Sequence, residues 1–524
     1  MRFTSSLLFD LLNALRDAGG TAIFGNTFFE EAEFSDASFS EVQFVGSDTV
    51  FADVKFAGRT NFDFAVFSNG NVSFKEAEFS GGVIFDDARF GGGDVDFAGA
   101  KFSGGDASLA GVDFGNGDVS FVGAQLDGVV GSFDGAQFAG GLVDFGGVSA
   151  TGSKLSFEGA SFRGRFEATM TCADVLSLRA AEFNEQVHLD VAAVSLACRE
   201  TRFGGPARIR VRYALVDLSD ADFSHPVTLA AHPTQFSDSQ GSLMLETPLA
   251  GRDPKVRITY LNGVDAEYLT LTNVDLSGTV FSGASHLDRL HLSGRANFLR
   301  PPANRSRRSV LAEEYQWRGW QKSDATTRDG SAADLQHLAA HPSVDPELLA
   351  SLYRQLRKSL EDGKNEPGAA DFYYGEMEMR RRSPHTPWGE SILLRVYWFV
   401  SGYGLRASRA LACLLASMLL TILALMAWGL PNKAPKPEIT GVLPAAGKML
   451  NLKVDTPDVK FHGGGRVSTE RLGRAVPVAL NSVLFRTSAQ NLTPIGTYVE
   501  MASRLIEPIF LGLALLAMRG RIKR

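Results

Sequence analysis

The feature that most constrains this sequence is a five-residue hydrophobic period near its N-terminus. In the stretch AEFSDASFSEVQF (residues 32–44), Phe34, Phe39 and Phe44 recur at every fifth position. A strand repeats every second residue and a helix every 3.6 residues, so neither regular element produces this period. From Phe51 onward the five-residue step alternates with a seven-residue step, so the repeating unit has twelve residues. Such regularity predicts a repeat architecture.

The residue types within each repeat indicate a chain wound into stacked coils. The sequence holds 38 Phe and 54 Gly, and a small residue such as Ala32 or Ala77 stands two positions before many of the Phe residues. A single coil cannot bury its Phe face, but each Phe that stacks between coils contributes about 1.5–3 kcal/mol of burial. We therefore predict a solenoid with these inward residues in its core: Phe34, Phe39, Phe44, Phe79, Phe102, Phe121, Phe138 and Phe162.

The stretch EEAEFSDASFSEVQF (residues 30–44) resembles the pentapeptide-repeat family, whose unit is A-(D/N)-(L/F)-X-X with the central Leu or Phe pointing inward. The resemblance implies a right-handed, four-sided β-helix, which we expect over residues 23–300. The twelve-residue alternation departs from a strict twenty-residue coil and predicts that some faces are lengthened. The repeat weakens after Phe162 and partly returns at Leu271, Leu276 and Phe281.

Residues 1–22 are expected to form a helix that caps the exposed first coil. Asp10 and Asn13 interrupt the apolar run, and no small-residue cleavage site follows, which argues against a signal peptide. The apolar residues fall instead at amphipathic helical spacing, and a repeat stack needs a cap at its end. These residues are Leu7, Leu8, Leu11, Leu12 and Leu15.

Residues 1–165 carry 23 acidic and 10 basic side chains, whereas the whole chain has a net charge of −7. Some soluble pentapeptide-repeat proteins mimic duplex DNA, so the resemblance offers one reading of this acidity. The acids occupy turn positions, however, and the chain continues into further segments. We therefore expect them to serve turns and solvation, and nucleic acid is not an expected partner. Cys172, Cys198 and Cys413 lack the spacing of a disulfide framework.

Residues 301–390 are expected to form a helical hairpin with linkers. The Pro- and Arg-containing stretch PPANRSRRS ends the repeat, and DGKNEPG separates two helical patterns that resemble one tetratricopeptide-like helix pair. Glu376 and Glu378 lie beside the basic run 380–382, and we expect them to be solvated surface residues rather than catalytic carboxylates. The apolar positions are Leu348, Leu349, Leu352, Leu356, Leu360, Ala369, Phe372, Tyr373 and Met377.

Two segments are apolar enough to cross a membrane. Residues 410–428 carry no charge over nineteen positions, which suits one crossing of a bilayer core. Within region 391–430, a mixed aromatic and basic stretch precedes this span and predicts an interfacial helix. Residues 497–518 form the second candidate. The basic flanks place the repeat domain and both termini in the cytoplasm of a multi-pass membrane protein. Residues 431–475 then form an extracytoplasmic loop, although this loop carries eight Lys and Arg.

Region 476–524 holds a segment too short to span a membrane, followed by the second span and a basic tail. SVLFRTSAQNLTP resembles the pore helix and filter of potassium-channel-like proteins, but RTSAQNL replaces the T-x-G-Y-G filter, so potassium selectivity is not expected. Gly402-Tyr403-Gly404 precedes the first span, and we interpret it as an interfacial turn. The pore-like or gating candidates are Arg486, Thr487, Ser488, Gln490, Asn491, Arg504 and Glu507. Glu500 and Arg504 are alternatively a surface pair.

These features favour a membrane protein without enzymatic activity. His residues do not cluster with Cys or carboxylates at metal-ligand spacing, and no nucleophile motif or phosphate-binding Gly-Lys loop is present, so we expect no catalytic, metal or cofactor residues. Two hypotheses stay open. In the first, the β-helix binds a cytoplasmic protein partner or ligand and is coupled to a homo-oligomeric, channel-like membrane domain. In the second, the protein is a non-conducting, membrane-anchored scaffold.

Overall fold

The computed structural model of the 524-residue chain is described at all positions except 69, 129, 152–153, 302–307, 321–343, 432–437, 441–452, 456–467, 485–491 and 523–524. The chain divides into two compact units, Met1–Glu376 and Met377–Arg524, and the boundary falls inside helix α4 (Glu366–Arg382). The first unit is a β-solenoid of about 12 turns followed by helices, and the second is helical apart from one short hairpin.

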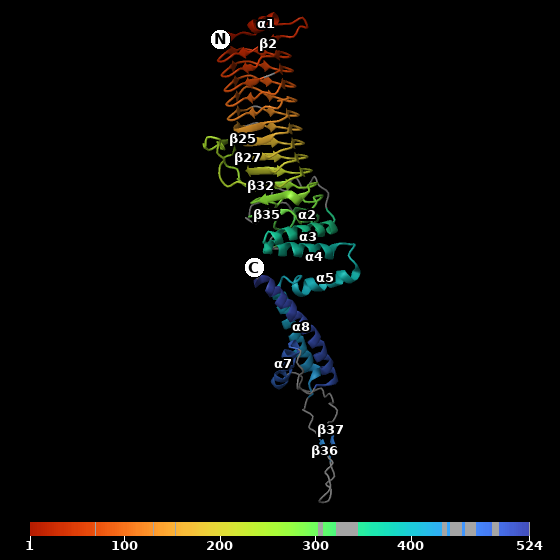
Figure 1. Ribbon diagram of the computed structural model, residues 1–524. Helices are drawn as coiled ribbons and strands as arrows, with labels where there is room; N and C mark the ends of the chain where they lie inside the picture. Colours follow the sequence, from red (N-terminus) through yellow and green to blue (C-terminus); the bar gives the residue numbers. More distant parts are fainter. Residues whose placement is uncertain are drawn as a thin grey trace. The chain divides into compact units, whose positions relative to one another are not determined.

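The solenoid, hereafter the coil stack, has four faces, each a pile of parallel strands (Figure 1). The first face contains β3 (Thr27–Phe28), β7 (Asp48–Val50), β11 (Asn71–Ser73), β15 (Val95–Asp96), β18 (Val119–Ser120), β22 (Leu142–Ala150), β25 (Arg165–Ser177), β27 (Val187–Ala197), β29 (Ala207–Arg212), β32 (Val227–Ala231), β34 (Leu269–Thr272) and β35 (His291–Ser293). The second face contains β1 (Arg2–Phe3), β4 (Glu33–Phe34), β8 (Lys55–Phe56), β12 (Glu78–Phe79), β16 (Lys101–Phe102) and β19 (Gln125–Leu126).

The remaining two faces complete each coil. The third contains β5 (Ala37–Ser38), β9 (Thr60–Asn61), β13 (Val83–Ile84), β17 (Ala107–Ser108), β20 (Gly131–Ser132), β23 (Leu155–Ser156), β30 (Leu215–Asp217) and β33 (Arg257–Tyr260). The fourth contains β2 (Ile23–Phe24), β6 (Gln43–Phe44), β10 (Val66–Phe67), β14 (Arg89–Phe90), β21 (Gln137–Phe138), β24 (Ser161–Phe162), β26 (Glu182–Phe183), β28 (Arg202–Phe203) and β31 (Asp222–Phe223). Strands β25 and β27 bend around a corner and serve the first and third faces.

Phe side chains form continuous columns inside the stack. On the fourth face, neighbouring rings from Phe24 to Phe203 are stacked with centroids 4.6–5.4 Å apart. All eight Phe residues predicted to be inward are at most 3% exposed. Where a column loses a Phe, Leu109 or Leu126 replaces it and is equally buried. The backbone that answers the five- and seven-residue steps is therefore a four-faced coil made of two twelve-residue units.

Coil length changes once along the stack. Register partners lie 23 residues apart at Phe67 and Phe90, 24 apart at Phe138 and Phe162, and 20 apart at Phe183 and Phe203. The early coils thus have the lengthened faces that the sequence predicts. After Phe162 the coils continue without a break as twenty-residue turns, although their Phe repeat is harder to recognise in the sequence.

Asp and Asn side chains join successive coils at one corner. The Asn71 Oδ1 accepts a hydrogen bond from the Asp94 N–H (2.9 Å), Asp94 accepts one from the Asp118 N–H (3.0 Å), and Asp118 accepts one from the Leu142 N–H (2.6 Å). At the same corner Gly70 has φ +79°, and a Cβ there would lie 1.3 Å from the Ser47 carbonyl oxygen. These acids serve the turns, as expected, by accepting backbone hydrogen bonds from the next coil.

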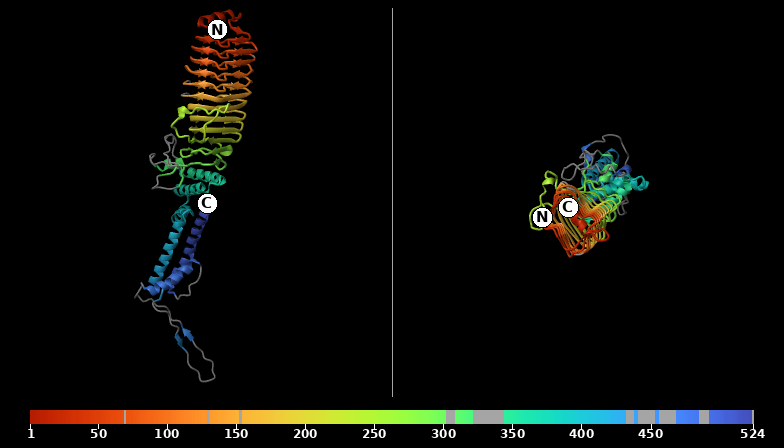
Figure 2. Two further views of the ribbon diagram at one scale, coloured as in Figure 1. Left: turned by 90° about the vertical axis from the view of Figure 1, so that its left-hand side faces the viewer. Right: turned by 90° about the horizontal axis from the view of Figure 1, so that it is seen from above.

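Helix α1 (Ser5–Ala14) lies at the N-terminal end of the stack, against β5 (Figure 2). Thr4 caps it through a hydrogen bond from the Leu7 N–H (3.3 Å). Leu8 is buried, whereas Leu7 is 43% exposed. The predicted amphipathic helix is present, although one of its Leu residues faces solvent.

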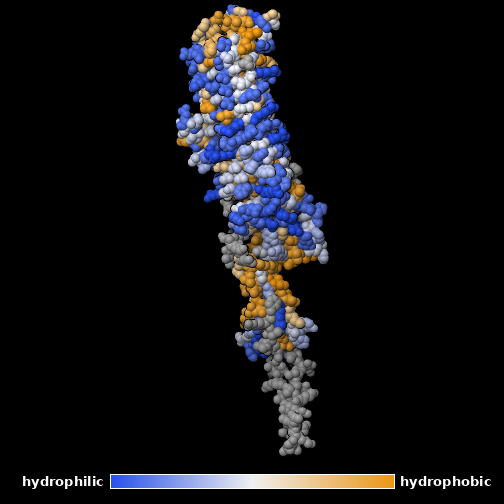
Figure 3. Space-filling model, viewed as in Figure 1, coloured by the Kyte–Doolittle hydropathy of each residue, from blue (hydrophilic) through white to orange (hydrophobic). Residues whose placement is uncertain are grey.

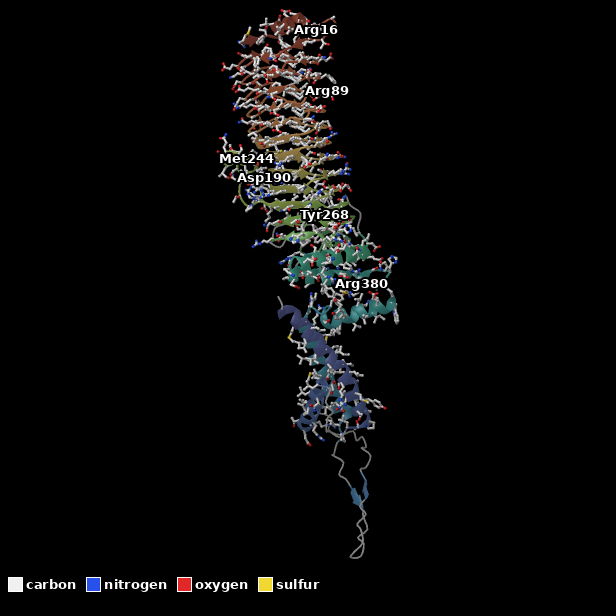
Figure 4. All side chains as sticks on the ribbon, viewed as in Figure 1. Arg16, Arg89, Asp190, Met244, Tyr268 and Arg380 are labelled. Atoms are coloured by element: carbon white, nitrogen blue, oxygen red, sulfur yellow. The ribbon has the colours of Figure 1, made fainter. Side chains whose placement is uncertain are left out.

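A loop between β32 and β33 packs on the side of the stack. It contains the 3-10 helix η1 (Thr247–Leu249), and its Phe236, Met244 and Leu249 pack against Ala192. In Figure 4, Met244 in this loop and Asp190 on the coils lie on the same side of the stack. The Arg212 guanidinium binds the Glu246 carboxylate at 2.8 Å, and both side chains are buried. Nothing in the repeat pattern predicts this loop.

Three helices cover the C-terminal end of the coil stack. They follow the short helix η2 (Ala266–Tyr268) and are α2 (Ala312–Trp317), α3 (Pro346–Asp362) and α4. The α3–α4 pair confirms the predicted hairpin, and of its predicted apolar residues Leu348 is exposed, at 60%. The expectation that Glu376 and Glu378 are solvated is wrong. Glu376 is 3% exposed and lies 2.9 Å from Arg354 and 3.2 Å from Arg357, while Glu378 is 6% exposed and lies 2.9 Å from Arg381.

Charged groups are also buried where α2 meets the last coils. Glu314 is fully buried and contacts Arg308 at 2.5 Å and Arg318 at 2.6 Å, and the Tyr353 hydroxyl donates to its second oxygen. Burial opposes ionisation of Glu314, but the two guanidinium groups outweigh it and lower its pKa. The neighbouring Glu313 accepts hydrogen bonds from two backbone N–H groups of the last coils, at Phe281 (2.5 Å) and Ser282 (3.1 Å). With no basic partner among its causes, burial raises the pKa of Glu313 to about 7.

The second unit consists mainly of four helices. They are α5 (Trp388–Ser401), α6 (Ala407–Ala424), α7 (Thr469–Val483) and α8 (Pro494–Ile522). A π-helical turn, η5 (Leu425–Gly429), continues α6, and the hairpin β36–β37 (Glu438–Thr440 and Lys453–Asp455) lies between η5 and α7. Two helices, Ala407–Gly429 and Pro494–Met518, are long and apolar enough to cross a membrane.

Candidate functional site in the helical unit

The candidate site is the contact region of α6, α7 and α8, which all pack on one another. An apolar cluster joins them: Leu425, Met426 and Leu430 from the α6–η5 end pack against Ala475 and Val478 from α7. Helix α7 begins at Thr469, seven residues before the predicted start of the short segment at 476. Part of the predicted loop 431–475 is therefore helical, and α7 packs on both long helices.

Polar side chains join the helices inside this unit. The Thr421 hydroxyl on α6 donates to the Glu507 carboxylate on α8 at 2.9 Å, and Glu507 is 0% exposed. The Ser503 hydroxyl on α8 hydrogen-bonds to Ser482 on α7 at 2.9 Å, and both residues are buried. Within the part of the chain that the structure describes, the second Glu507 oxygen has no hydrogen-bond partner.

Two glycines allow the end of α6–η5 and the start of α8 to approach closely. A Cβ on Gly496 would lie 2.4 Å from the Gly429 carbonyl oxygen. Next to this contact, the Thr493 N–H donates to the Gly429 carbonyl at 3.0 Å, and the Thr493 hydroxyl donates to the Trp428 carbonyl at 2.7 Å. Small residues at helix contacts and side chains that satisfy backbone carbonyls are typical of helix packing in lipid.

The outer surface of the helical unit is apolar. Figure 3 shows hydrophobic residues over α6 and α8, whereas the coil stack is largely hydrophilic. Helix α5 adds an apolar strip, because Trp388, Leu393 and Phe399 are 81%, 68% and 68% exposed. The exposed apolar residues of α6 and α8 are Leu411, Leu415, Leu419, Leu420, Leu423, Met501, Leu505, Ile506, Ile509, Leu515 and Leu516.

The predicted pore residues are placed as follows. Arg486, Thr487, Ser488, Gln490 and Asn491 lie outside the described residues. Arg504 lies on α8 and contacts Glu500 at 2.5 Å, which is the pair that we weighed against a gating role. Glu507 faces Thr421 of its own chain.

The Gly402-Tyr403-Gly404 segment is the turn between α5 and α6. All three residues have positive φ angles, and Tyr403 is buried, with its hydroxyl 3.3 Å from Glu378. Arg381 and Arg409 both lie over the Trp398 ring of α5, at 4.6 and 5.3 Å from its centroid. In Figure 4, Arg380 marks the end of α4 that leads into this region. The geometry is that of a tight, aromatic-packed turn.

One group of possible metal ligands occurs among the described residues. Asp265, Glu267 and His286 lie close together on the coil stack, and Asp265 and Glu267 are already engaged. His286 lies 2.8 Å from Asp265, and Arg289 pairs with Glu267. The group offers three ligands at most, two of them exposed, and its geometry gives no reason to assign an ion.

Comparison with known families identifies the repeats. Two family models described as pentapeptide repeats match the chain, one over residues 22–48 and the other over residues 65–113. The coil stack is thus a pentapeptide-repeat β-solenoid. No curated protein and no solved structure matches the chain.

Three polar residues of the site escaped the sequence analysis, namely Thr421, Ser482 and Ser503. Each is a small hydroxyl residue in an apolar helix, and each also donates to a carbonyl of its own helix: Thr421 to Ser417, Ser482 to Val478 and Ser503 to Glu500. A helical-wheel alignment of these hydroxyls with Glu507 is the signal that could have revealed a shared inner face.

Proposed function

We propose that the protein is a membrane-anchored pentapeptide-repeat scaffold, in which α6–η5 and α8 cross a bilayer and the coil stack presents a protein-binding surface. The observation that carries the proposal is the inverted polarity of the helical unit. Its Leu residues face outward, while Thr421, Ser482, Ser503 and Glu507 face inward. In water such an apolar exterior is unfavourable, whereas lipid accommodates it and favours internal pairing of the polar groups.

Orientation follows from the basic residues around the two helices. Arg406 and Arg409 precede the first helix, and Arg519, Arg521, Lys523 and Arg524 follow the apolar part of the second. Positive residues favour the cytoplasmic side, so the proposal places the coil stack in the cytoplasm. Protease treatment of sealed inside-out vesicles should then digest the coil stack, while right-side-out vesicles should protect it. The opposite pattern would refute this orientation.

Fractionation tests the anchor. A fragment that ends at Pro384 retains the coil stack and the α3–α4 pair, which bury their own apolar faces. We expect this fragment to be soluble and folded, while the full chain remains in the membrane fraction after a high-salt wash. A fragment that still sediments with membranes would show that attachment does not depend on α6 and α8.

Exposed apolar residues at the N-terminal end of the stack support a protein partner for the scaffold. Phe9 and Phe28 are 61% and 62% exposed, and Figure 3 shows hydrophobic residues at this end. Cross-linking of the full chain in its native membrane should capture a partner that Phe9→Ser loses and that Arg208→Ser, at an exposed site on the coils, retains. Equal capture by both variants would exclude this end as the partner site.

A channel is the second candidate function. The order of long helix, short packed helix and long helix agrees with a two-span pore module, and a homo-oligomer would be required to enclose a path. Glu507 faces Thr421 of its own chain, which favours a structural role for it over a position on a shared axis. Ion flux in liposomes tests the candidate: a pore predicts that Arg486→Gln changes flux or ion preference, whereas a scaffold gives no flux with either protein.

A further inference from the structure

A polar cavity of about 630 Å³ lies where the last coil meets the α3–α4 connection. Its walls come from two short segments, residues 294–300 after β35 and residues 363–367 between the helices. This volume falls within the range of about 300–1,000 Å³ that is usual for small-molecule sites.

The cavity is lined by three cations and two amides. Arg295 and Arg300 come from the coil side, and Lys364 comes from the helix side. Asn297 and Asn365 add amide groups, and none of the lining residues is acidic. All three basic residues are exposed to solvent, so their charges are available to a ligand. Such a lining favours an anion with several oxygens.

The walls are held in place by contacts outside the cavity. On α3, the Ser359 hydroxyl donates to the Leu290 carbonyl at 2.5 Å, and the Lys358 ammonium group contacts Asp288 at 2.8 Å. Gly363 approaches the coil so closely that a Cβ there would lie 2.9 Å from the Leu292 carbonyl oxygen. The cations are thus presented from fixed backbones, which lowers the entropy cost of binding.

Lys364 occupies a backbone conformation that usually belongs to glycine. Its φ is +58°, and it ends α3 in the manner of a Schellman turn, with the Asn365 N–H donating to the Leu360 carbonyl at 2.8 Å. A left-handed conformation is unfavourable for a residue with a Cβ, and glycine is the common choice at this position. Backbone strain of this kind points to a function of the side chain that glycine would lack.

The start of α4 adds a weaker favourable field. Asn365 and Pro367 line the cavity at the point where this 17-residue helix begins. The N-terminal end of a helix carries a partial positive charge, which falls off within its first turn. The field therefore acts together with the three side-chain cations.

We propose that this cavity binds a ligand bearing phosphate groups, held by Arg295, Arg300 and Lys364. The ligand is either a small soluble phosphate compound or the headgroup of an anionic lipid, because both present the same chemistry. The site belongs to the first unit and is separate from the membrane-spanning function proposed above.

Calorimetry of the full chain in nanodiscs of zwitterionic lipid tests the proposal, with inorganic pyrophosphate as the probe. Loss of one charge-assisted contact should weaken binding about tenfold or more, so Arg295→Gln, Arg300→Gln and Lys364→Gln should each show this loss. Arg208→Gln, which removes an exposed cation from the coil face, should bind as the wild type does. Absence of pyrophosphate binding to the wild-type chain would overturn the proposal.

Lys364→Gly separates binding from folding. Glycine suits φ +58°, so this variant should unfold at the same or a higher temperature than the wild type while its pyrophosphate affinity falls about tenfold. Unchanged affinity in Lys364→Gly together with Arg295→Gln would refute the site.

Nanodiscs that contain phosphatidylglycerol distinguish the two sources of phosphate. If a lipid headgroup occupies the cavity, these discs should weaken pyrophosphate binding to the wild-type chain through competition, and the competition should vanish in Lys364→Gly. If pyrophosphate binds equally well in both kinds of disc, the ligand is a soluble phosphate compound.

Discussion

The coil stack and the helical unit are built with opposite polarity. In the coils, Phe rings form the interior and charged residues cover the outside, as in the column that runs through Phe97, Phe121 and Phe145. In the helical unit, Leu and Ile residues form the outside, while Thr421 and Glu507 meet in the interior. The difference teaches that one chain carries two folding rules, each suited to its own solvent.

The two regions also differ in how their contacts repeat. Every coil makes nearly the same ring-stacking and backbone contacts with its neighbours, so stability is distributed over many equivalent interfaces. The helical unit depends on single contacts that occur once, such as Ser482–Ser503 and Gly429–Gly496. A change in one coil should therefore have a local effect, whereas a change at one helix contact affects the whole packing of α6, α7 and α8.

Removal of a stacked ring should have the largest effect. Phe121 is 1% exposed and stacks at 4.8 Å on both Phe97 and Phe145, so Phe121→Ala should reduce local stability by about 3–5 kcal/mol. Limited proteolysis of the coil stack at increasing urea concentration measures this loss. Gln125→Ala, at an exposed position of β19, should stay within about 0.5 kcal/mol. Equal susceptibility of the two variants would contradict the rule of an apolar interior.

Glu313 is an exception to the polarity of the first unit, because it is a carboxyl group buried beside the coils. Its pKa is raised to about 7 from 4.5, so between these pH values the folded state binds more protons than the unfolded state. Stability should thus fall as pH rises from about 4.5 to 7, by up to about 3 kcal/mol.

Urea unfolding at pH 5 and pH 8 measures this dependence, and Glu313→Gln should be less sensitive to pH than the wild type. The Gln side chain can still accept the Phe281 and Ser282 hydrogen bonds. Glu347→Gln, at an exposed site on α3, is the matched control and should keep the wild-type dependence. If Glu313→Gln changes stability equally at both pH values, Glu313 is not the titrating group.

Loss of one interhelical hydrogen bond should have a smaller effect. Ser503→Ala removes the hydroxyl that meets Ser482 at 2.9 Å, and hydrogen bonds of this type in membrane proteins contribute about 0.6 kcal/mol on average and at most about 1.7. Unfolding in detergent mixtures measures the change. Leu505→Met, on the exposed face of α8, should leave stability unchanged. A larger loss from Leu505→Met would contradict the assignment of inner and outer faces.

The smallest effect is expected where a coil corner keeps its acceptor. Asp118→Asn preserves an oxygen for the Leu142 N–H, so its cost should be a few tenths of a kcal/mol, whereas Asp118→Ala should lose about 1 kcal/mol. The proteolysis assay used for Phe121 can compare both variants. Equal effects would mean that the carboxylate charge, rather than the hydrogen bond, stabilises the corner.

Much of the coil stack could be predicted because its information is local. Phe34, Phe39 and Phe44 announce the repeat within thirteen residues, and the twelve-residue unit agrees with coils of 23 or 24 residues. The twenty-residue coils were less visible because β25 and β27 are long strands that run through a corner and carry Val, Ala and Leu instead of spaced Phe residues.

Contacts between distant segments could not be predicted from local patterns. Glu376 looks exposed beside a basic run, but Arg354 and Arg357 of α3 reach it because the two helices are antiparallel neighbours. The start of α7 was placed too late because Arg471 and Arg474 suggested a loop, whereas Arg471 is buried and donates to the Leu430 carbonyl. The Thr421–Glu507 contact joins positions 86 residues apart.

The in-register stacking of the coils has a consequence for how long the stack can become. Since each coil pairs only with the coils above and below, whole coils can be added or removed without creating a new kind of contact. Each one changes the distance between the ends of the stack by one strand spacing, about 4.8 Å. Near Phe114, the quantum of such an insertion is 24 residues, whereas near Phe203 it is 20. Length is thus a property that gene duplication can tune in discrete steps, which makes this part of the chain a molecular ruler between whatever its two ends hold.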